Sequence, residues 1–540
     1  MLSKIWNGES KTITSAALIL GGASLASRLL GVIRDRVLAG RFGAGDVLDA
    51  YYAAFRLPDA VYSLLVIGAL SAGFIPVFTE YLMRDGNRAQ QDAWRLVNEV
   101  IGWLGAALAA FSLLLILFAP MVVPLITPGF HGVKLADTVM LSRIMFLSPL
   151  ILGLSAIFGS VLQGMKRFLA FAVAPLFYNL GIIVGALVFT RWWGISGLAW
   201  GVVFGALLHL LAQYFTVAGM GFRLQPRLKL ADDGVPTVAR LSLPRVAALA
   251  VSQIDLTVAT LIASTLTAGS IAVFNLANNL QMVPVVLVGT SFAVAAFPTF
   301  TRLAAKKEHA KLAENVNGVT RQILFFVVPF SVLLLLLRAQ FVRVILGSGN
   351  FSWSDTIRTA DTLAFFTISI FAQSVVPLLS RAFYALKDST TPLLVGLISV
   401  GVDVIGNITL SGPLGVRGLA LAFTLASVVQ VTFLWVTLRM KTGTLYESLL
   451  IRSLMKITVS AVPMALVMQL TKNFIGPRLD LQTFVGIFMQ GVLAGVVGLS
   501  VYFGIALLVR SEEASGFYRN VKRRIGMEQL PVVAADEAIE

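Results

Sequence analysis

Long apolar segments follow one another along most of this 540-residue chain, and they restrict its fold more than any other feature. About 14 segments reach the length of roughly 18 residues that a helix needs to cross the hydrocarbon core of a bilayer. They lie at residues 12–40, 47–82, 96–126, 135–163, 168–190, 195–221, 241–265, 269–302, 317–347, 356–385, 391–411, 415–438, 450–474 and 482–509. Lipid offers the backbone no hydrogen-bond partners, so each segment must satisfy its own N–H and C=O groups as a helix. The sequence therefore predicts an all-α polytopic membrane protein with about 14 transmembrane helices.

Composition agrees with a membrane protein and limits the classes of function. The chain is 57% hydrophobic and 13% charged, with a mean hydropathy of +0.86. Its net charge of +15 does not indicate nucleic-acid binding, because Lys and Arg gather in alternate connections between the apolar segments, about 25 against about 8. This bias predicts that both termini are cytoplasmic. The absence of cysteine excludes disulfides, thiolate metal sites and cysteine nucleophiles.

An internal repeat divides the chain. Three pairs of similar sequence are each 221 residues apart: Lys166 with Lys387, Gly194 with Gly415, and Gly129 with Asn350. Each copy holds an even number of spans, so the two copies have the same orientation in the membrane, as in transporters built from parallel repeats. We predict two six-helix lobes at 1–221 and 241–440, a cytoplasmic linker at 222–240, two extra helices at 441–510 and a flexible cytoplasmic tail at 511–540.

The first two spans carry charges that a lipid-facing helix would not tolerate. Arg28 and Asp35 share one face of the first helix, with Arg34 about 120° around it, and Asp49 and Arg56 share a face of the second. A charge at the middle of a membrane helix costs about 2.5–3.5 kcal/mol on insertion scales, so these side chains must line a polar interior. Two interpretations remain. In the first, the arginines bind a phosphate or diphosphate, because a guanidinium pairs with phosphate oxygens and stays charged. In the second, they form ion pairs that hold two helices together.

The second repeat differs from the first. Its eighth span offers the neutral Asn279 in place of an arginine-rich segment. Elsewhere it carries oxygen-rich side chains: Asp255 in the seventh span, Asp403 and Asn407 spaced i,i+4 in the eleventh, and Thr424 as a weaker fourth member. Such ligands suit a hard cation such as Na⁺, or a proton. The alternative is that each is hydrogen-bonded within the helix bundle.

Several motifs are shared with one transporter family. They are Ser27-Arg28-x-Leu-Gly31-x-x-Arg34-Asp35, Phe42-Gly43-Ala44-Gly45, Ala54-Phe55-Arg56-Leu57-Pro58, Phe74-Ile75-Pro76 and Phe383-Tyr384-Ala385-Leu386-Lys387-Asp388. With these motifs the chain resembles the MurJ (MviN) lipid II flippases, which belong to the multidrug/oligosaccharidyl-lipid/polysaccharide exporter superfamily. The resemblance covers about residues 12–510. The resemblance implies two six-helix lobes plus two extra helices, and alternating access that exports an undecaprenyl-diphosphate-linked peptidoglycan precursor to the outer leaflet.

The resemblance also implies roles for particular residues. Arg28, Arg34, Asp35 and Asp49 are similar to substrate-handling positions of the family, and the group around Asp255 resembles a sodium site. The chain departs from the family pattern where Tyr62, Ser63, Ile67 and Asn279 replace charged residues. Taking the charge pattern and the resemblance together, we predict these substrate-binding residues: Arg28, Arg34, Asp35, Asp49, Arg56 and Asn279. We predict that Na⁺ is held by Asp255, Asp403, Asn407 and Thr424, and we expect no catalytic residue and no other cofactor.

These observations predict a lipid II flippase of the bacterial inner membrane, which is a secondary transporter and not an enzyme. Its expected partners are lipid II or a related polyprenyl-diphosphate-linked glycan, membrane lipids and cell-wall synthesis proteins, without nucleic acid. Three alternatives stay open. They are an exporter of another lipid-linked oligosaccharide or of drugs, a membrane glycosyltransferase, and a transport-inactive scaffold for cell-wall synthesis. A cationic-drug exporter would need an acidic cavity, and a glycosyltransferase a sizeable extramembrane loop, whereas every loop here is short.

Overall fold

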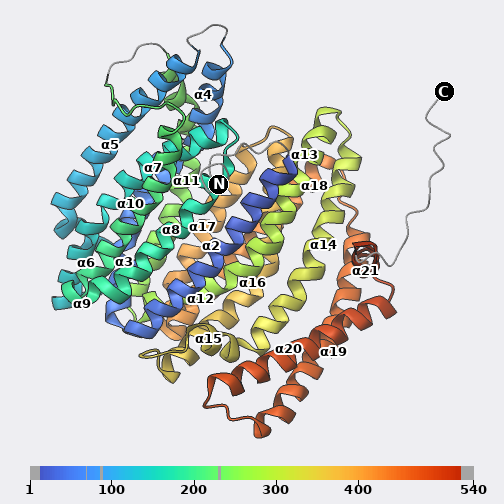
Figure 1. Cartoon of the computed structure of the whole chain (residues 1–540). Helices are drawn as coiled ribbons and strands as arrows, with labels where there is room; N and C mark the ends of the chain where they lie inside the picture. Colours follow the sequence, from blue (N-terminus) through green and yellow to red (C-terminus); the bar gives the residue numbers. More distant parts are fainter. Residues whose placement is uncertain (1–12, 68–69, 85–88, 229–232, 525–540) are drawn as a thin grey trace, which may run out of the picture. The chain divides into compact units, whose positions relative to one another are not determined.

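The computed structural model describes residues 13–67, 70–84, 89–228 and 233–524. Every regular element in this part of the chain is a helix (Figure 1), which confirms the predicted all-α class. Part of the predicted linker and the end of the predicted tail lie outside the described residues.

The helices that precede the linker form the first repeat. They are α2 (Ile13–Phe42), α3 (Asp46–Val61), α4 (Ile75–Leu82), α5 (Ala89–Ile126), α6 (Gly132–Met145), α7 (Leu147–Gly164), α8 (Phe168–Val184), α9 (Thr190–Trp193) and α10 (Ser196–Ala218), with π-helical η1 (Tyr62–Ile67), η2 (Leu70–Phe74) and η3 (Gly185–Phe189). The helix α11 (Gly234–Ser264) begins within the segment assigned to the linker.

The second repeat and the C-terminal helices follow. They are α12 (Ser270–Pro284), α13 (Ser291–Ala305), α14 (His309–Leu336), α15 (Arg338–Leu346), α16 (Trp353–Ala385), α17 (Thr390–Leu414), α18 (Val416–Thr442), α19 (Glu447–Ile475), α20 (Phe484–Leu508) and α21 (Glu512–Arg524), with π-helical η4 (Val285–Thr290) and the short 3₁₀-helix η5 (Gly476–Arg478).

In the described part, 11 helical segments are long and apolar enough to cross a membrane. They coincide with all but three of the predicted spans. The three others, at 12–40, 47–82 and 241–265, correspond to α2, to α3 with α4, and to α11. These helices carry the residues of the predicted polar interior and, in α11, Asp255 of the predicted cation site.

The backbone shows the internal repeat. Lys166 and Lys387 have φ angles of 57° and 60°, and Gly194 and Gly415 have φ angles of 55° and 60°. Left-handed backbone is uncommon, above all for a side chain such as lysine. π-helix also occurs in the second span of each copy, as η1 after α3 and as η4 after α12. The two copies therefore share unusual local geometry at equivalent places.

By packing, the described residues fall into two compact units. Unit 1 comprises Met1–Asn278, Ile345–Thr362 and Gly396–Ala426, and unit 2 comprises Asn279–Val344, Leu363–Val395 and Ser427–Glu540. Each unit has its own apolar core. In the core of unit 2, the Tyr502 hydroxyl on α20 donates to the Phe325 carbonyl at 2.8 Å.

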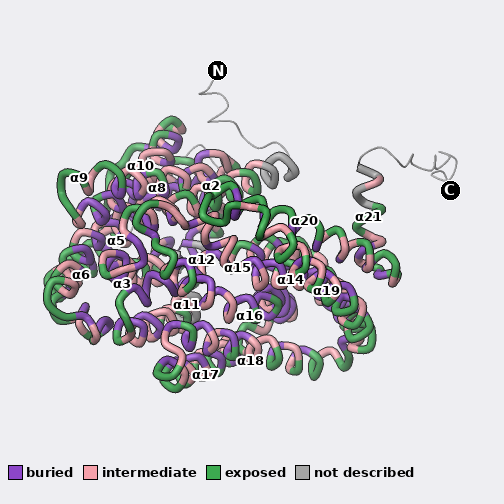
Figure 2. Tube along the Cα trace, turned by 90° about the horizontal axis from the view of Figure 1, so that it is seen from below, coloured by how far each residue is buried: buried purple, intermediate pink, exposed green. Residues whose placement is uncertain are grey.

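Many helices leave much of their apolar surface uncovered by protein. In the most apolar 18-residue stretch of α17, only 22% of the residues are buried, and the same is true of α5. Figure 2 shows exposed positions recurring along α17 and α18. Apolar side chains left in this state require lipid as their neighbour, because membrane helices bury this surface against acyl chains.

The start of the predicted flexible tail is instead a packed helix. In α21, Ala514 is 2% exposed, and the Phe517 ring lies 5.4 Å from the ring of Phe326 and 5.8 Å from that of Phe503, centroid to centroid. Glu513 accepts hydrogen bonds from Ser453 at 2.9 Å and Ser511 at 2.7 Å. The prediction of a flexible tail is therefore wrong for α21, because one face of this polar helix is apolar enough to dock.

Candidate functional site

Arg34 and Asp35 form an ion pair on α2, and Arg34 also contacts α8. Arg34 donates from Nε and Nη2 to the Asp35 Oδ1 atom at 3.0 and 2.8 Å. Its Nη1 donates to the Asn179 Oδ1 atom on α8 at 3.0 Å. The Asp35 side chain is buried, whereas that of Arg34 keeps 24% of its surface exposed. Arg34 is therefore ion-paired within α2, contacts α8 through a neutral amide, and still offers surface to a ligand.

Arg28 lies apart from this pair. It is exposed, and it makes no hydrogen bond or ion pair with a residue that the structure describes. The helix α2 runs unbroken through Gly31, so the six positions between Arg28 and Arg34 separate their backbones by roughly 9 Å along the axis. The structure does not bring these two predicted residues together.

Arg56 joins helices from both repeats within unit 1. Its Nε donates to the Thr260 hydroxyl on α11 at 2.7 Å, and its Nη2 donates to Asn275 Oδ1 on α12 at 2.8 Å. Both acceptors are neutral, so neither offsets the guanidinium charge. The exposed carboxylate of Asp59, one turn further on, lies within electrostatic range of both Arg56 and Arg34.

Asp49 is enclosed by donors. Its Oδ2 accepts from Lys134 Nζ on α6 and from the backbone N–H of Gly269, both at 2.7 Å, and its Oδ1 accepts from the N–H of Ala272 at 2.9 Å. The last two groups belong to the first turn of α12, where N–H groups lack helical partners and the helix dipole favours an anion. Asp49 therefore caps a helix of the second repeat and is 2% exposed. We call Asp49, Lys134 and the α12 N-terminus the Asp49 clasp.

Further contacts join the two repeats at the same end of unit 1. The Asn350 N–H donates to the Gly40 carbonyl at 2.7 Å, and the Asn350 side chain donates to the Arg41 carbonyl at 2.7 Å. Gly269 has a φ of 84° and lies so close to Ala44 that a Cβ there would be 1.9 Å from the Ala44 carbonyl oxygen. These contacts, like the clasp, come from connections that carry few basic residues. By the predicted topology this is the outer end.

Three members of the predicted cation site, Asp255, Asp403 and Asn407, lie together within unit 1. Asn407 Nδ2 donates to Asp403 Oδ2 at 2.8 Å, and the carboxyl groups of Asp255 and Asp403 lie within hydrogen-bonding reach of each other. Asp255, Asp403 and Asn407 each keep an Oδ1 atom that is buried and without a partner among the described residues. Thr424 is buried. Two adjacent carboxylates with unpaired oxygens require a cation or a proton, so these residues fit Na⁺.

Asn279 belongs to unit 2 and is half-buried, one turn beyond Asn275 on α12. Among the described residues, no group of three or more His, Cys, Asp or Glu side chains could hold a metal ion.

Four residues of this site are not among the predicted substrate-binding residues. They are the hydrogen-bond partners Asn179, Thr260 and Asn275, and the clasp residue Lys134. Each is a polar side chain within or beside an apolar span, and Lys134 is a rare basic residue in a connection that carries few of them. Those signals single out the residues but do not indicate which charged group each one contacts.

Comparison with known proteins establishes the family. The family model described as lipid II flippase MurJ matches residues 38–489. A probable lipid II flippase MurJ of Rhizobium tropici is 30% identical over 521 residues, which cover 94% of this chain and 96% of the relative. A solved lipid II flippase MurJ in an inward closed conformation matches with a TM-score of 0.76 at 23% identity, covering 93% of this chain and 99% of that one.

An inward-facing multidrug resistance transporter of the MATE family, in the MOP superfamily, matches with a TM-score of 0.64 at 15% identity, covering 78% of this chain and 96% of that one. At these identities the two solved structures establish the fold alone. The match of the family model and the relative at 30% identity carry the assignment. The chain belongs to the lipid II flippase MurJ family, whose members are multi-pass transporters of the bacterial inner membrane and not enzymes.

Proposed function

We propose that this chain moves lipid II, the undecaprenyl-diphosphate-linked peptidoglycan precursor, from the inner to the outer leaflet by alternating access. Family membership supports the proposal. The observation that carries it is Arg56, whose two hydrogen-bond acceptors are both neutral and whose Nη1 has no partner among the described residues. A diphosphate is the anion that such a guanidinium pairs with most readily.

The transport cycle follows from the position of the charged groups. Arg56 and the exposed part of Arg34 receive the diphosphate while the Asp49 clasp holds the outer end of unit 1 closed. Release to the outer leaflet requires the clasp to open, so that Asp49 exchanges the α12 N-terminus and Lys134 for water. An inside-negative membrane potential favours the outward movement of a negative headgroup by about 2.3 kcal/mol per charge per 100 mV.

Na⁺ is proposed to couple to this cycle through Asp255, Asp403, Asn407 and Thr424. The three buried oxygens without partners support the assignment. When bound, the cation would neutralise the adjacent carboxylates and draw α11 and α17 together. Asn407 orients the Asp403 carboxylate through a hydrogen bond of 2.8 Å.

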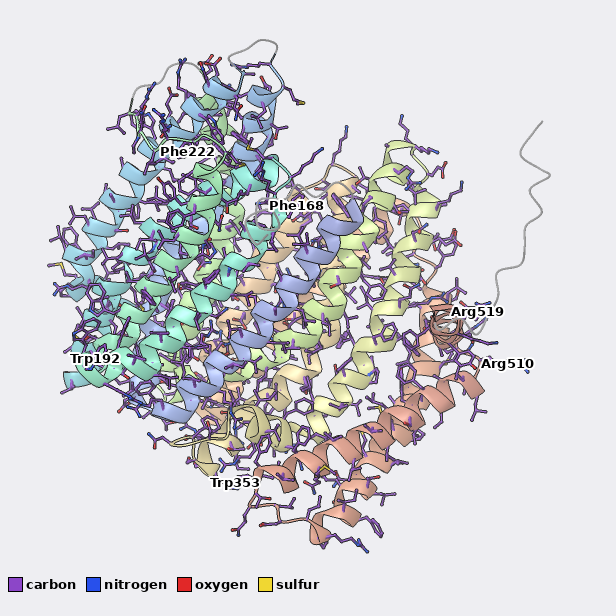
Figure 3. The ribbon with its side chains drawn as sticks, viewed as in Figure 1. Phe168, Trp192, Phe222, Trp353, Arg510 and Arg519 are labelled. Carbon is purple, nitrogen blue, oxygen red and sulfur yellow. The ribbon has the colours of Figure 1, made fainter. Side chains whose placement is uncertain are left out.

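We further propose that both termini are cytoplasmic, which the distribution of Lys and Arg supports. Exposed tryptophans indicate where one membrane–water interface lies, without deciding which side it faces. Trp192 and Trp353 are 71% and 54% exposed and lie at one end of unit 1, with Phe168 and Phe222 at the other (Figure 3). Tryptophan favours the membrane–water interface. Contact with cell-wall synthesis proteins stays a prediction.

The test is replacement of the flippase in a bacterium whose own flippase is depleted. This chain should restore growth and the exposure of lipid II on the outer leaflet, and Arg34→Ala should lose both while reaching the membrane at the normal level. Failure of the folded wild-type chain to expose lipid II would contradict the proposal and favour another polyprenyl-diphosphate-linked glycan as cargo.

A further inference from the structure

A gap in the backbone hydrogen bonding of α5 is repaired by a charged side chain. Pro120 lies inside α5 and has no N–H, so the carbonyl of Ile116, four residues earlier, loses its helical donor. Arg143 of α6 supplies one: its Nε donates to the Ile116 carbonyl oxygen at 3.1 Å. In lipid an unpaired carbonyl is costly, which explains an arginine at this place in an apolar span.

Beside this contact lies an open groove between α5 and α6. It has a volume of about 650 Å³, and its walls include Pro120, Pro124, Leu135, Ala136 and Met140, with Arg143 as the charged group. The lining is otherwise apolar. No described segment of the chain fills the groove, so lipid is its neighbour in the membrane.

Arg143 has hydrogen-bonding capacity left over. It is exposed, and Nη1 and Nη2 have no partner among the described residues. An arginine left facing hydrocarbon would be strongly unfavourable. A phosphate group is the partner that a guanidinium fork accepts in planar, bidentate geometry.

The depth of Arg143 suits the phosphate of a membrane lipid. The span Gly132–Gly164, which α6 and α7 form together, has 33 residues, or roughly 50 Å, which exceeds the hydrocarbon core by roughly 20 Å. If both ends protrude equally, the Arg143 backbone is roughly 6 Å inside the hydrocarbon on the side of the α5–α6 connection. Helical side chains lean toward the N-terminus of their helix, which directs this guanidinium toward the headgroups.

We propose that the groove between α5 and α6 binds an anionic phospholipid of the leaflet that meets the α5–α6 connection. One acyl chain lies against the proline-lined wall of α5, and the phosphate pairs with Nη1 and Nη2 of Arg143. This site is separate from the charged interior and does not depend on the identity of the transported lipid. The bound lipid fills the groove beside Pro120.

The test measures lipid-dependent stability of the full-length purified protein in detergent. Phosphatidylglycerol should raise the melting temperature more than phosphatidylcholine does. Arg143→Gln, which keeps a donor but removes the charge, should weaken the apparent affinity for phosphatidylglycerol by roughly tenfold or more. Ala136→Trp, which fills the groove but keeps Arg143, should reduce the response similarly. Arg191→Gln, at another exposed arginine, should leave the response unchanged.

A further variant separates lipid binding from the repair of α5. In Pro120→Ala the new N–H can bond the Ile116 carbonyl, so Arg143→Gln in this background should fold without the cost of an unpaired carbonyl. The double variant should still lose the phosphatidylglycerol response. An undiminished response in the double variant, or an equal response to both lipids in the wild type, would overturn the proposal.

Discussion

At the level of single residues, Arg56 should be indispensable because its guanidinium joins both repeats through two neutral acceptors. We expect Arg56→Gln to reduce exposure of lipid II by at least about tenfold, since it removes a charge-assisted interaction with the diphosphate. Arg56→Lys should retain part of the activity, because it keeps the charge but loses the planar fork. Growth under depletion and outer-leaflet labelling of lipid II measure both effects.

The matched control is Arg191→Gln, which removes the charge of an exposed arginine outside the charged interior. Its growth should be normal. Membrane levels of all variants are compared by immunoblot. Normal transport by Arg56→Gln at the normal level would show that the diphosphate is held elsewhere.

Asp255 and Asp403 lead to a prediction on cation dependence. Na⁺ should raise the melting temperature of the purified wild type, and K⁺ should not, because the adjacent carboxylates need a small hard cation. Asp403→Asn should lose this response. In buffer without Na⁺ it should melt at or above the wild-type temperature, because one of two repelling charges is gone. An equal Na⁺ response in wild type and variant would exclude the site.

Sequence reasoning found the charged members of the interior but not their partners. The cost of charge in lipid marks Arg34, Asp35, Asp49 and Arg56 without any structure. Their partners come from distant segments: Asn179 is 145 residues from Arg34, and Thr260 is 204 from Arg56. Helical spacing relates residues only a few positions apart. The separation of the exposed Arg28 from Arg34 follows from the unbroken course of α2.

At the level of elements, α21 provides a test of docking. Burial alone would raise the pKa of Glu513, but hydrogen bonds from Ser511 and Ser453 and the charge of Arg321 bring it below its ordinary 4.5. A lowered carboxyl pKa stabilises docking above pH 4.5 and loses that effect as the pH falls below it. Glu513→Gln should therefore weaken docking at neutral pH, by about 1–3 kcal/mol.

A spin label at Tyr518→Cys, the sole cysteine of that variant, reports this docking. Label mobility should rise in the wild type below about pH 4.5 and should already be high at pH 7 in Glu513→Gln. Glu512→Gln is the control, because the Glu512 side chain is 71% exposed and exposed ion pairs contribute little. Unchanged mobility in Glu513→Gln would mean that the apolar face of α21 suffices for docking.

Among the elements, the apolar spans are predictable because the bilayer itself fixes their length and polarity. The eleven apolar spans follow the predicted segments closely. The π-helices and α21 were not predicted. A π-helical turn reflects how neighbouring helices pack, and α21 is polar in composition, so only its contacts with Phe326 and Phe503 distinguish it from a loose tail.

For the molecule as a transporter, the proposed alternating access requires that helices of the two repeats separate at the end of unit 1 that is the outer one in the predicted topology. Gly40 of the first repeat and Ser348 of the second meet there. A Cβ built on Gly40 lies 3.4 Å from the Ser348 Cβ, close to the 3.5–4.5 Å that disulfides favour. Because the chain has no cysteine, Gly40→Cys with Ser348→Cys introduces a single defined crosslink.

Oxidation of this double variant should stop exposure of lipid II, and a reducing agent should restore it, because the crosslink holds together surfaces that must part. The two single variants should transport lipid II under both conditions, which separates the crosslink from any effect of the substitutions. Near-complete crosslinking with undiminished transport would mean that the contact between α2 and the segment before α16 persists throughout the cycle. The opening would then have to occur elsewhere, and the Asp49 clasp would serve stability instead of gating.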